Sequence, residues 1–247
     1  MRNDKEGLIV LTIVSVIVLI SLSSVFVIGQ PTGVATITNM SHLTKNASAP
    51  DSRTDGKGTI NTANLDAIQQ DMKWKAYVGN VSSTFVLDDD ADYTIYQWTL
   101  SSFDGEVYAS RNSSISWGSI AVASVTHKEN EDYALNHSSS AADSINQTFV
   151  TQTHRQFDVG TTSIDASTGY AIATNLNDTA QALTVNSVFQ EVLLYDGASL
   201  VYASLVENNH LGYRNDSSTT YDFQMIMAEN ATASAINIPY FFYLELQ

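Results

Sequence analysis

Residues 77–87 read YVGNVSSTFVL, and the side chains in this stretch alternate between apolar and polar along much of its length. In an extended chain, residues two apart lie on the same face of the strand. One face would carry the apolar side chains of Tyr77, Val81, Phe85 and Leu87. The other would carry the polar side chains of Asn80, Ser82 and Thr84. The stretch therefore predicts a β-strand with one face in the core and one face in water.

Three later segments repeat this alternation. Their apolar faces consist of Tyr96, Trp98 and Leu100, of Tyr221, Phe223, Met225 and Met227, and of Tyr240, Phe242, Leu244 and Leu246. Several short alternating strands are typical of an antiparallel β-sandwich. The expected fold class is therefore mainly β, with a single N-terminal transmembrane helix followed by a sandwich-like outer domain. One or two short helices, or a long excursion, are expected between Ser119 and Phe149.

Two Asp-Gly pairs predict tight hairpin turns, because glycine adopts the positive φ that a type I′ turn requires. They are Asp104-Gly105 and Asp196-Gly197, and each is followed by the sequence Val-Tyr-Ala-Ser, at 107–110 and 201–204. The repeated text is consistent with an internal duplication. The alternative is independent use of the same hairpin chemistry at both places.

An apolar run from Leu8 to Ile28 contains no charged residue. As a helix it would be about 31 Å long, which matches the roughly 30 Å hydrocarbon core of a bilayer. Arg2 and Lys5 precede the run, and the next basic residue is Lys45. The positive-inside rule therefore places the N-terminus in the cytoplasm and the rest of the chain outside.

These observations predict four parts: a cytoplasmic tip (residues 1–7), a transmembrane helix or signal anchor (8–28), an extracellular stalk (29–62) and a β-rich outer domain (63–247). The stalk is expected because its residues show no sustained apolar period and include several Pro and Gly. Within these parts we expect a short strand at Val34–Thr38 and a short helix at 63–72, capped by Thr62. Cleavage before Gln30, which would release a secreted protein, is an open alternative.

The composition excludes several classes of protein. The 247 residues include 11 basic and 26 acidic side chains, for a formal net charge of −15, which argues against nucleic acid as a partner. The chain has no Cys, which excludes a disulfide scaffold and a thiolate metal site. With 29 Ser, 24 Thr and 18 Asn, the surface is expected to be polar without being highly charged.

Asn-x-Ser/Thr sequons are about twice as frequent as chance would give for this composition. They begin at Asn39, Asn46, Asn80, Asn112, Asn136, Asn146, Asn177, Asn215 and Asn230. All nine follow the apolar run, on the side expected to be outside. The set predicts N-linked glycans on an exported domain.

A calcium ion is the one cofactor that the sequence suggests. Clustered carboxylates at Asp88, Asp90 and Asp92 are of the kind that calcium prefers, although the spacing is not that of an EF-hand, and a solvated acidic turn explains them as well. The sequence shows no nucleophile elbow, phosphate-binding loop or dinucleotide fingerprint, so the chain is expected not to be an enzyme.

Four segments resemble archaeal exported, membrane-anchored β-domain surface proteins of unassigned activity. They are Trp74–Ser82, Gly105–Arg111, Tyr221–Gln224 and Tyr240–Leu246. The resemblance implies a location at the archaeal cell surface and supplies no catalytic residue. In addition, Lys5-Glu6-Gly7 followed by an apolar run resembles the N-termini of archaeal type IV pilin-like proteins, which implies removal of a short leader after Gly7.

The function expected from the sequence is that of a glycosylated structural or adhesion-type protein, anchored in the membrane through Leu8–Ile28. One alternative is a subunit of an extracellular filament, assembled through a pilin-like helix or through addition of a strand to a neighbour's sheet. Another is a secreted carbohydrate-binding module, because exposed aromatic rings can stack on sugars.

Overall fold

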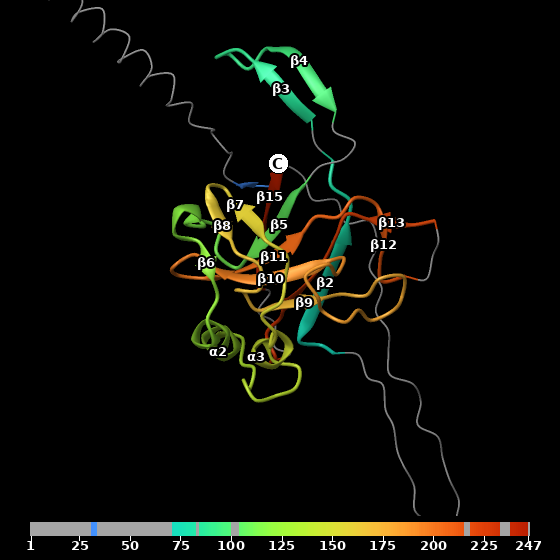
Figure 1. The fold of residues 1–247 in the computed structure, drawn as a ribbon. Coiled ribbons are helices and arrows are strands. Elements are labelled where there is room, and N and C mark those ends of the chain that lie inside the picture. Colours follow the sequence, from blue (N-terminus) through green and yellow to red (C-terminus); the bar gives the residue numbers. More distant parts are fainter. Residues whose placement is uncertain are drawn as a thin grey trace, which may run out of the picture.

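The computed structural model describes residues 31–33, 71–82, 84–99, 104–214, 218–232 and 238–246. Its centre is a seven-stranded antiparallel sheet with the strand order β1-β15-β5-β11-β10-β6, in which β9 also pairs with β10 (Figure 1). The strands of this sheet are β1 (Thr32–Gly33), β5 (Gly105–Ser110), β6 (Ala121–Val122), β9 (Ala171–Ala173), β10 (Gln190–Tyr195), β11 (Leu200–Leu205) and β15 (Phe241–Leu246).

Four two-stranded antiparallel sheets complete the strands. They pair β2 (Trp74–Gly79) with β14 (Phe223–Ala228), β3 (Thr84–Asp88) with β4 (Thr94–Thr99), β7 (Phe157–Val159) with β8 (Thr162–Ile164), and β12 (His210–Leu211) with β13 (Thr220–Tyr221). The mainly β, antiparallel class predicted from the alternation is confirmed.

The central sheet is covered on both faces. One core contains Val107, Leu193 and Tyr202 and is closed by Met225 and Met227 of β14. The other contains alternate residues of the same strands and is closed by β7 and β8, through Phe157, Val159 and Ile164. Because both faces are buried, β5 and β11 contain no exposed residue, and their sequences lack the wet face of a simple two-sheet sandwich.

Side chains of the central sheet and of Tyr240 satisfy backbone groups of β14. Ser204 Oγ donates to the carbonyl of Gln224 at 3.0 Å, and Tyr240 Oη donates to that of Ala228 at 2.7 Å. Glu191 Oε2 accepts the N–H of Ile226 at 2.8 Å. Glu191 is fully buried, and burial raises its pKa well above the ordinary value, so it joins the two sheets as an uncharged acid.

The predicted helical region contains two short helices, α2 (Val125–Ala134) and α3 (Ile145–Thr148). Ser124 caps α2 by accepting the N–H of His127. Asp132 of α2 is fully buried and accepts the N–H groups of Ile145 and Asn146 at 2.8 and 3.0 Å. This carboxylate therefore satisfies the first turn of α3 and fixes one helix to the other.

The predicted single strand over residues 77–87 is wrong. It divides at Asn80–Ser82 into β2 and β3, where the N–H of Val81 donates to Asp222 Oδ2 at 2.8 Å. Tyr77 and Val81 pack against the core as expected. Phe85 and Leu87 do not, because β3 and β4 form a hairpin that projects from the body (Figure 1).

One of the two predicted hairpin turns is present. Asp196-Gly197 joins β10 to β11, with Asp196 Oδ1 accepting the N–H groups of Ala198 and Ser199 at 2.9 and 2.6 Å and Gly197 at φ +94°. Asp104-Gly105 joins no hairpin, because β4 pairs with β3 rather than with β5.

The two Val-Tyr-Ala-Ser segments pair with each other in β5 and β11, with Tyr108 opposite Ala203 and Tyr202 opposite Ala109. Tyr108 and Tyr202 nevertheless enter different cores. The two identical four-residue segments therefore place their tyrosine side chains on opposite faces of the central sheet.

The boundary between stalk and outer domain requires correction. Thr32 and Gly33, predicted to lie in the stalk, pair with Leu244 and Tyr243 of β15 and so belong to the domain. The rest of the predicted stalk, from Val34 onwards, lies outside the described residues. The predicted strand at Val34–Thr38 lies outside the described residues, as does the predicted helix at 63–72 except for Asp71 and Met72, which are not helical.

Candidate functional site

Two glutamates face each other across β5 and β15. The register places Glu106 directly opposite Glu245, and both are almost completely buried, with 5% and 3% of their surface exposed. Tyr108 lies on the same face, two residues further along β5. Like charges at directly opposed positions destabilise a sheet. The pair is therefore expected to carry less than two negative charges, with a proton on one of the two carboxyl groups.

A single hydroxyl group joins the two carboxyl groups. Tyr108 Oη lies 2.8 Å from Glu245 Oε2 and 3.4 Å from Glu106 Oε2. A phenol has one proton to donate, and the shorter distance shows that Tyr108 donates its hydrogen bond to Glu245. Glu245 Oε1 also accepts the backbone N–H of Gly160, in the turn between β7 and β8, at 2.8 Å.

Burial and then the charge of Glu245 raise the pKa of Glu106 to about 8, against smaller opposing effects of Arg155 and Tyr108. Burial also raises the pKa of Glu245, although the hydrogen bonds from Tyr108 and Gly160 lower it. Glu106 is therefore protonated at neutral pH and can donate to Tyr108 Oη, while Tyr108 donates to Glu245. These three residues, Glu106, Tyr108 and Glu245, are called the carboxyl triad below.

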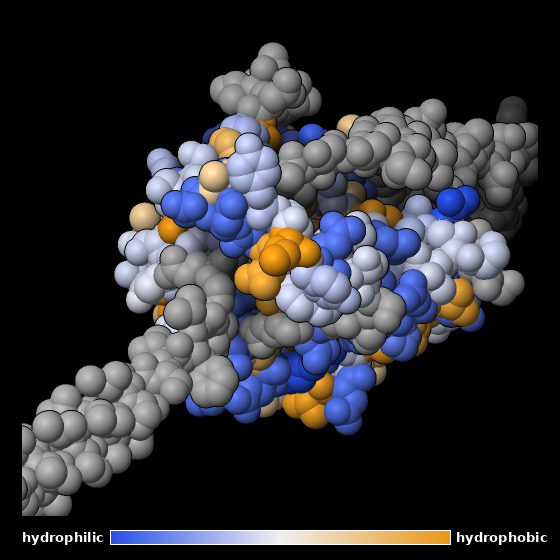
Figure 2. Space-filling view, turned by 90° about the horizontal axis from the view of Figure 1, so that it is seen from above, coloured by the Kyte–Doolittle hydropathy of each residue, from blue (hydrophilic) through white to orange (hydrophobic). Residues whose placement is uncertain are grey.

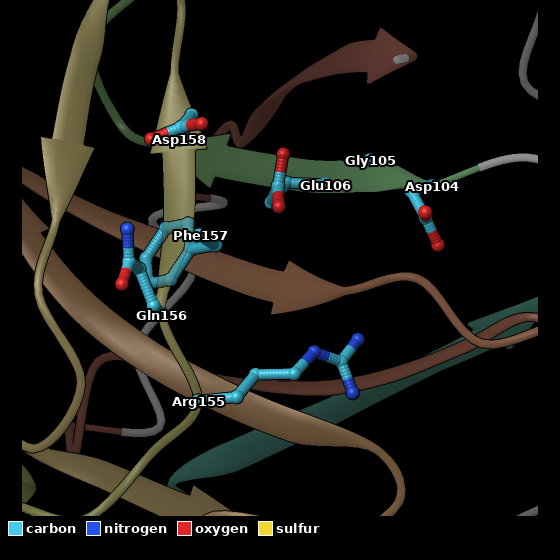
Figure 3. Close-up of a pocket in the computed structure, with 7 residues that line it drawn as sticks. All are labelled: Asp104, Gly105, Glu106, Arg155, Gln156, Phe157 and Asp158. Atoms are coloured by element: carbon cyan, nitrogen blue, oxygen red, sulfur yellow. The ribbon is translucent and has the colours of Figure 1, made fainter.

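A cavity of about 430 Å³ adjoins Glu106 of the carboxyl triad (Figure 3). It lies between the start of β5 and the segment that enters β7, and its lining residues are Asp104, Gly105, Glu106, Arg155, Gln156, Phe157 and Asp158. Arg155 supplies a positive charge, but Glu207 forms an ion pair with it and its Nη2 donates to the carbonyl of Val206 at 3.0 Å.

The carboxyl triad can hold and release a proton where three segments meet. Loss of the Glu106 proton would place two carboxylates opposite each other between β5 and β15, and Glu245 also binds the turn between β7 and β8. The protonation of Glu106 therefore determines how much negative charge lies between β5 and β15. Glu245 has almost no exposed surface, so the arrangement favours this structural role over attack on a substrate.

His154 is a second buried titratable group beside the cavity. Its Nε2 accepts the N–H groups of Gly169 and Thr168 at 2.8 and 3.2 Å, so its Nδ1 is the nitrogen that donates, to the carbonyl of Arg155 at 2.6 Å. Burial lowers the pKa of His154, which keeps the ring neutral. Both ring nitrogens hold the loop that carries Arg155, and neither is available to a metal ion.

Six of the nine predicted glycosylation sites lie among the described residues, and each has solvent access. Asn80, Asn136 and Asn177 are exposed, while Asn112, Asn146 and Asn230 are partly exposed. Asn136 Nδ2 donates to Asn230 Oδ1 at 3.2 Å, so two sequons lie side by side. Asn39, Asn46 and Asn215 lie outside the described residues.

The predicted calcium ligands Asp88, Asp90 and Asp92 lie at the exposed tip of the β3–β4 hairpin. The turn is organised by Asp89, whose Oδ1 accepts the N–H groups of Ala91 and Tyr93 at 2.9 and 3.0 Å. Across the described ranges, no three His, Asp or Glu side chains are grouped in a way that could hold a metal ion.

Sequence reasoning missed the carboxyl triad. The available signal was the presence of single acidic residues inside apolar strands, at Glu106 in GEVYAS and at Glu245 in FFYLEL. An isolated acid in such a strand is either on a wet face or buried with a partner. Choosing between these required knowledge that β5 and β15, far apart in sequence, are neighbours.

Comparison of the chain with protein-family models, with curated proteins and with solved structures finds no match. The predicted transmembrane run Leu8–Ile28 lies outside the described residues. From Pro31 onwards, the helices that the structure describes are too short or too polar to span a bilayer.

Proposed function

We propose that the chain is a non-enzymatic surface protein whose N-terminal helix, Leu8–Ile28, crosses the membrane and whose β domain is displayed on the outer side. The observation that supports this most directly is the pairing of Thr32 and Gly33 with β15. It means that the folded body begins almost immediately after the apolar run. An anchor joined so closely to a folded body is suited to display at a membrane surface.

The body would lie against the bilayer. Three residues lie between Ile28 and Thr32, so the chain takes four Cα–Cα steps from one to the other. An extended chain advances at most about 3.5 Å per step, so β1 lies within roughly 14 Å of the end of the apolar run. The polar headgroup layer of a bilayer is itself about 5–8 Å thick. Little room is left for a spacer between the membrane and the sheet.

The surface of the domain is consistent with display. Both faces of the central sheet are buried, which gives a rigid body without disulfides. The six described sequons are accessible to solvent, and two of them, at Asn136 and Asn230, lie side by side. Glycans attached there would cover much of a surface that is otherwise polar but sparsely charged. On this basis we propose that the chain, like the archaeal surface proteins that it resembles, has a structural or adhesive function.

The anchor is tested by a pair of double variants in the full chain. Val16→Arg with Val18→Arg is expected to abolish membrane retention, because each Arg at the centre of a spanning helix costs about 2.5–3.5 kcal/mol. Val16→Leu with Val18→Leu keeps the run apolar and should behave as the unsubstituted chain does. Retention is measured by alkaline carbonate extraction, and sidedness by protease added to intact cells. Retention of the Arg variant, or extraction of the unsubstituted chain, would show that the run is not a membrane anchor.

The mature N-terminus separates this proposal from its alternatives. A mature protein that begins at Met1 supports the anchor, and one that begins at Leu8 supports the pilin-like filament subunit. One that begins at Gln30 supports a secreted protein, such as a carbohydrate-binding module. N-terminal sequencing of material from the native membrane gives the answer.

Glycosylation has its own expected result. The intact mass of native protein should exceed the polypeptide mass of 26.9 kDa by several glycans. Peptide mapping is expected to place glycans on exposed sequons such as Asn80, Asn136 and Asn177. A measured mass equal to that of the bare polypeptide would remove glycans from the proposal and leave the anchor unaffected.

A further inference from the structure

The β3–β4 hairpin, residues 84–99, presents an apolar face that the body does not cover; it is called the arm below. The register places Phe85 opposite Trp98 and Leu87 opposite Tyr96, so these four side chains share one face. Their exposed fractions are 46%, 48%, 53% and 58%, respectively. Tyr96 and Trp98 also contact each other edge to face, with ring centroids 4.8 Å apart.

The arm lies at the end of the body that carries β1. β4 ends at Thr99, and the described chain resumes at Asp104 to enter β5. Gly105, the first residue of β5, pairs with Leu246 near the end of β15, the strand on which β1 lies. Figure 1 shows the arm beyond this end, near β1 and the C-terminus, and α2 at the far side of the body. Seen from above, this end presents orange apolar patches among blue hydrophilic residues (Figure 2).

The charges of the arm limit how it could meet another surface. Its tip carries Asp88, Asp89, Asp90 and Asp92, all exposed, and residues 84–99 contain no Lys or Arg. Four carboxylates are too costly to place in hydrocarbon, so the tip must remain in water. The apolar face can still lie along a surface, with the tip at its wet margin.

We propose that the apolar face of the arm, formed by Phe85, Leu87, Tyr96 and Trp98, lies on the lipid surface of the membrane that holds the anchor. The inference rests on the proposed membrane anchor, because β1 brings this end of the body to the bilayer. Trp and Tyr favour the membrane interface, where their rings meet the acyl region and their polar atoms meet water. Phe85 and Leu87 add the apolar area between them.

The acidic tip also specifies the lipid. Near a negatively charged headgroup layer, the four carboxylates would be repelled, most strongly at low salt. Zwitterionic headgroups impose no such penalty. The arm therefore fits a zwitterionic surface and should lift away as anionic lipid is added.

The absence of Cys allows a direct test with single labels on the full chain, reconstituted in phosphatidylcholine vesicles. Leu87→Cys places an environment-sensitive fluorophore on the arm, and Tyr133→Cys places it on α2, at a residue that is 85% exposed. The label at position 87 should emit at shorter wavelength and be quenched severalfold more strongly by brominated phosphatidylcholine than the label at position 133. Replacing half of the lipid with phosphatidylglycerol at low salt should reduce that difference.

Flotation of the vesicles separates failure of the arm from failure of the anchor. If the chain does not float with the vesicles, the proposed function is wrong and the arm inference is lost with it. If the chain floats but positions 87 and 133 are quenched equally, the anchor stands and the arm inference is overturned. Protection of position 87 by a second copy, detected as cross-linking between Leu87→Cys chains, or by added oligosaccharide, would likewise overturn it.

Discussion

Replacing Gly105 with alanine is expected to lower the free energy of unfolding by about 3 kcal/mol or more, because two costs act at one position. Gly105 has a φ of +152°, a backbone conformation that residues with a side chain rarely adopt. A Cβ there would lie 2.0 Å from the backbone oxygen of Glu245, which cannot move without displacing β15 from β5. The loss would be measured by urea unfolding followed by circular dichroism.

Gly118→Ala is the matched control for this substitution. Gly118 has no other atom within 4 Å of the added Cβ, so its effect should remain within about 0.5 kcal/mol. If the two alanine variants unfold at the same urea concentration, the close approach of β15 to β5 at Gly105 is wrong.

Replacing Glu106 with glutamine is expected to stabilise the protein at alkaline pH. The folded-state pKa of Glu106, about 8, lies above its ordinary value of 4.5. Its contribution to stability is therefore fully present below pH 4.5, decreases as the pH rises, and is lost once the pH passes 8. The total loss is on the order of 3–5 kcal/mol. Glutamine carries no charge at any pH, and its amide can donate to Tyr108 Oη as the protonated acid does.

The two proteins should therefore have similar melting temperatures near pH 5 and differ most between pH 8 and 9, where Glu106→Gln should melt at the higher temperature. Glu129→Gln, at an exposed position of α2, removes the same charge without burial and should follow the pH dependence of the unsubstituted protein. A parallel pH dependence for all three proteins would show that Glu106 ionises normally and that the carboxyl triad does not hold an extra proton.

The sequence was informative where structure depends on neighbouring residues. Alternation identified the apolar face of β15, and Tyr240, Phe242, Leu244 and Leu246 all pack against one core. Asp196-Gly197 predicted its hairpin because the turn is specified by the residues that form it.

The same reasoning failed where the outcome depends on what covers a strand. Phe85 and Trp98 alternate as core residues do, yet they lie outside both cores that the structure describes and remain half exposed. Glu245 occupies the position of a wet-face residue, yet Gly160 and Tyr108 enclose it. Periodicity shows that two faces differ and does not show which contacts each face will find.

The pairing of the central strand β5 also has a consequence for the order of events during folding. β5 finds one partner in β11 and the other in β15, which ends one residue before the last residue of the chain. Contacts this distant in sequence are slow to form, so the pairing of β5 with β15 is expected to be a late step of folding. In the described sheet β1 neighbours β15 alone, so β1 can join the sheet only once β15 is in place.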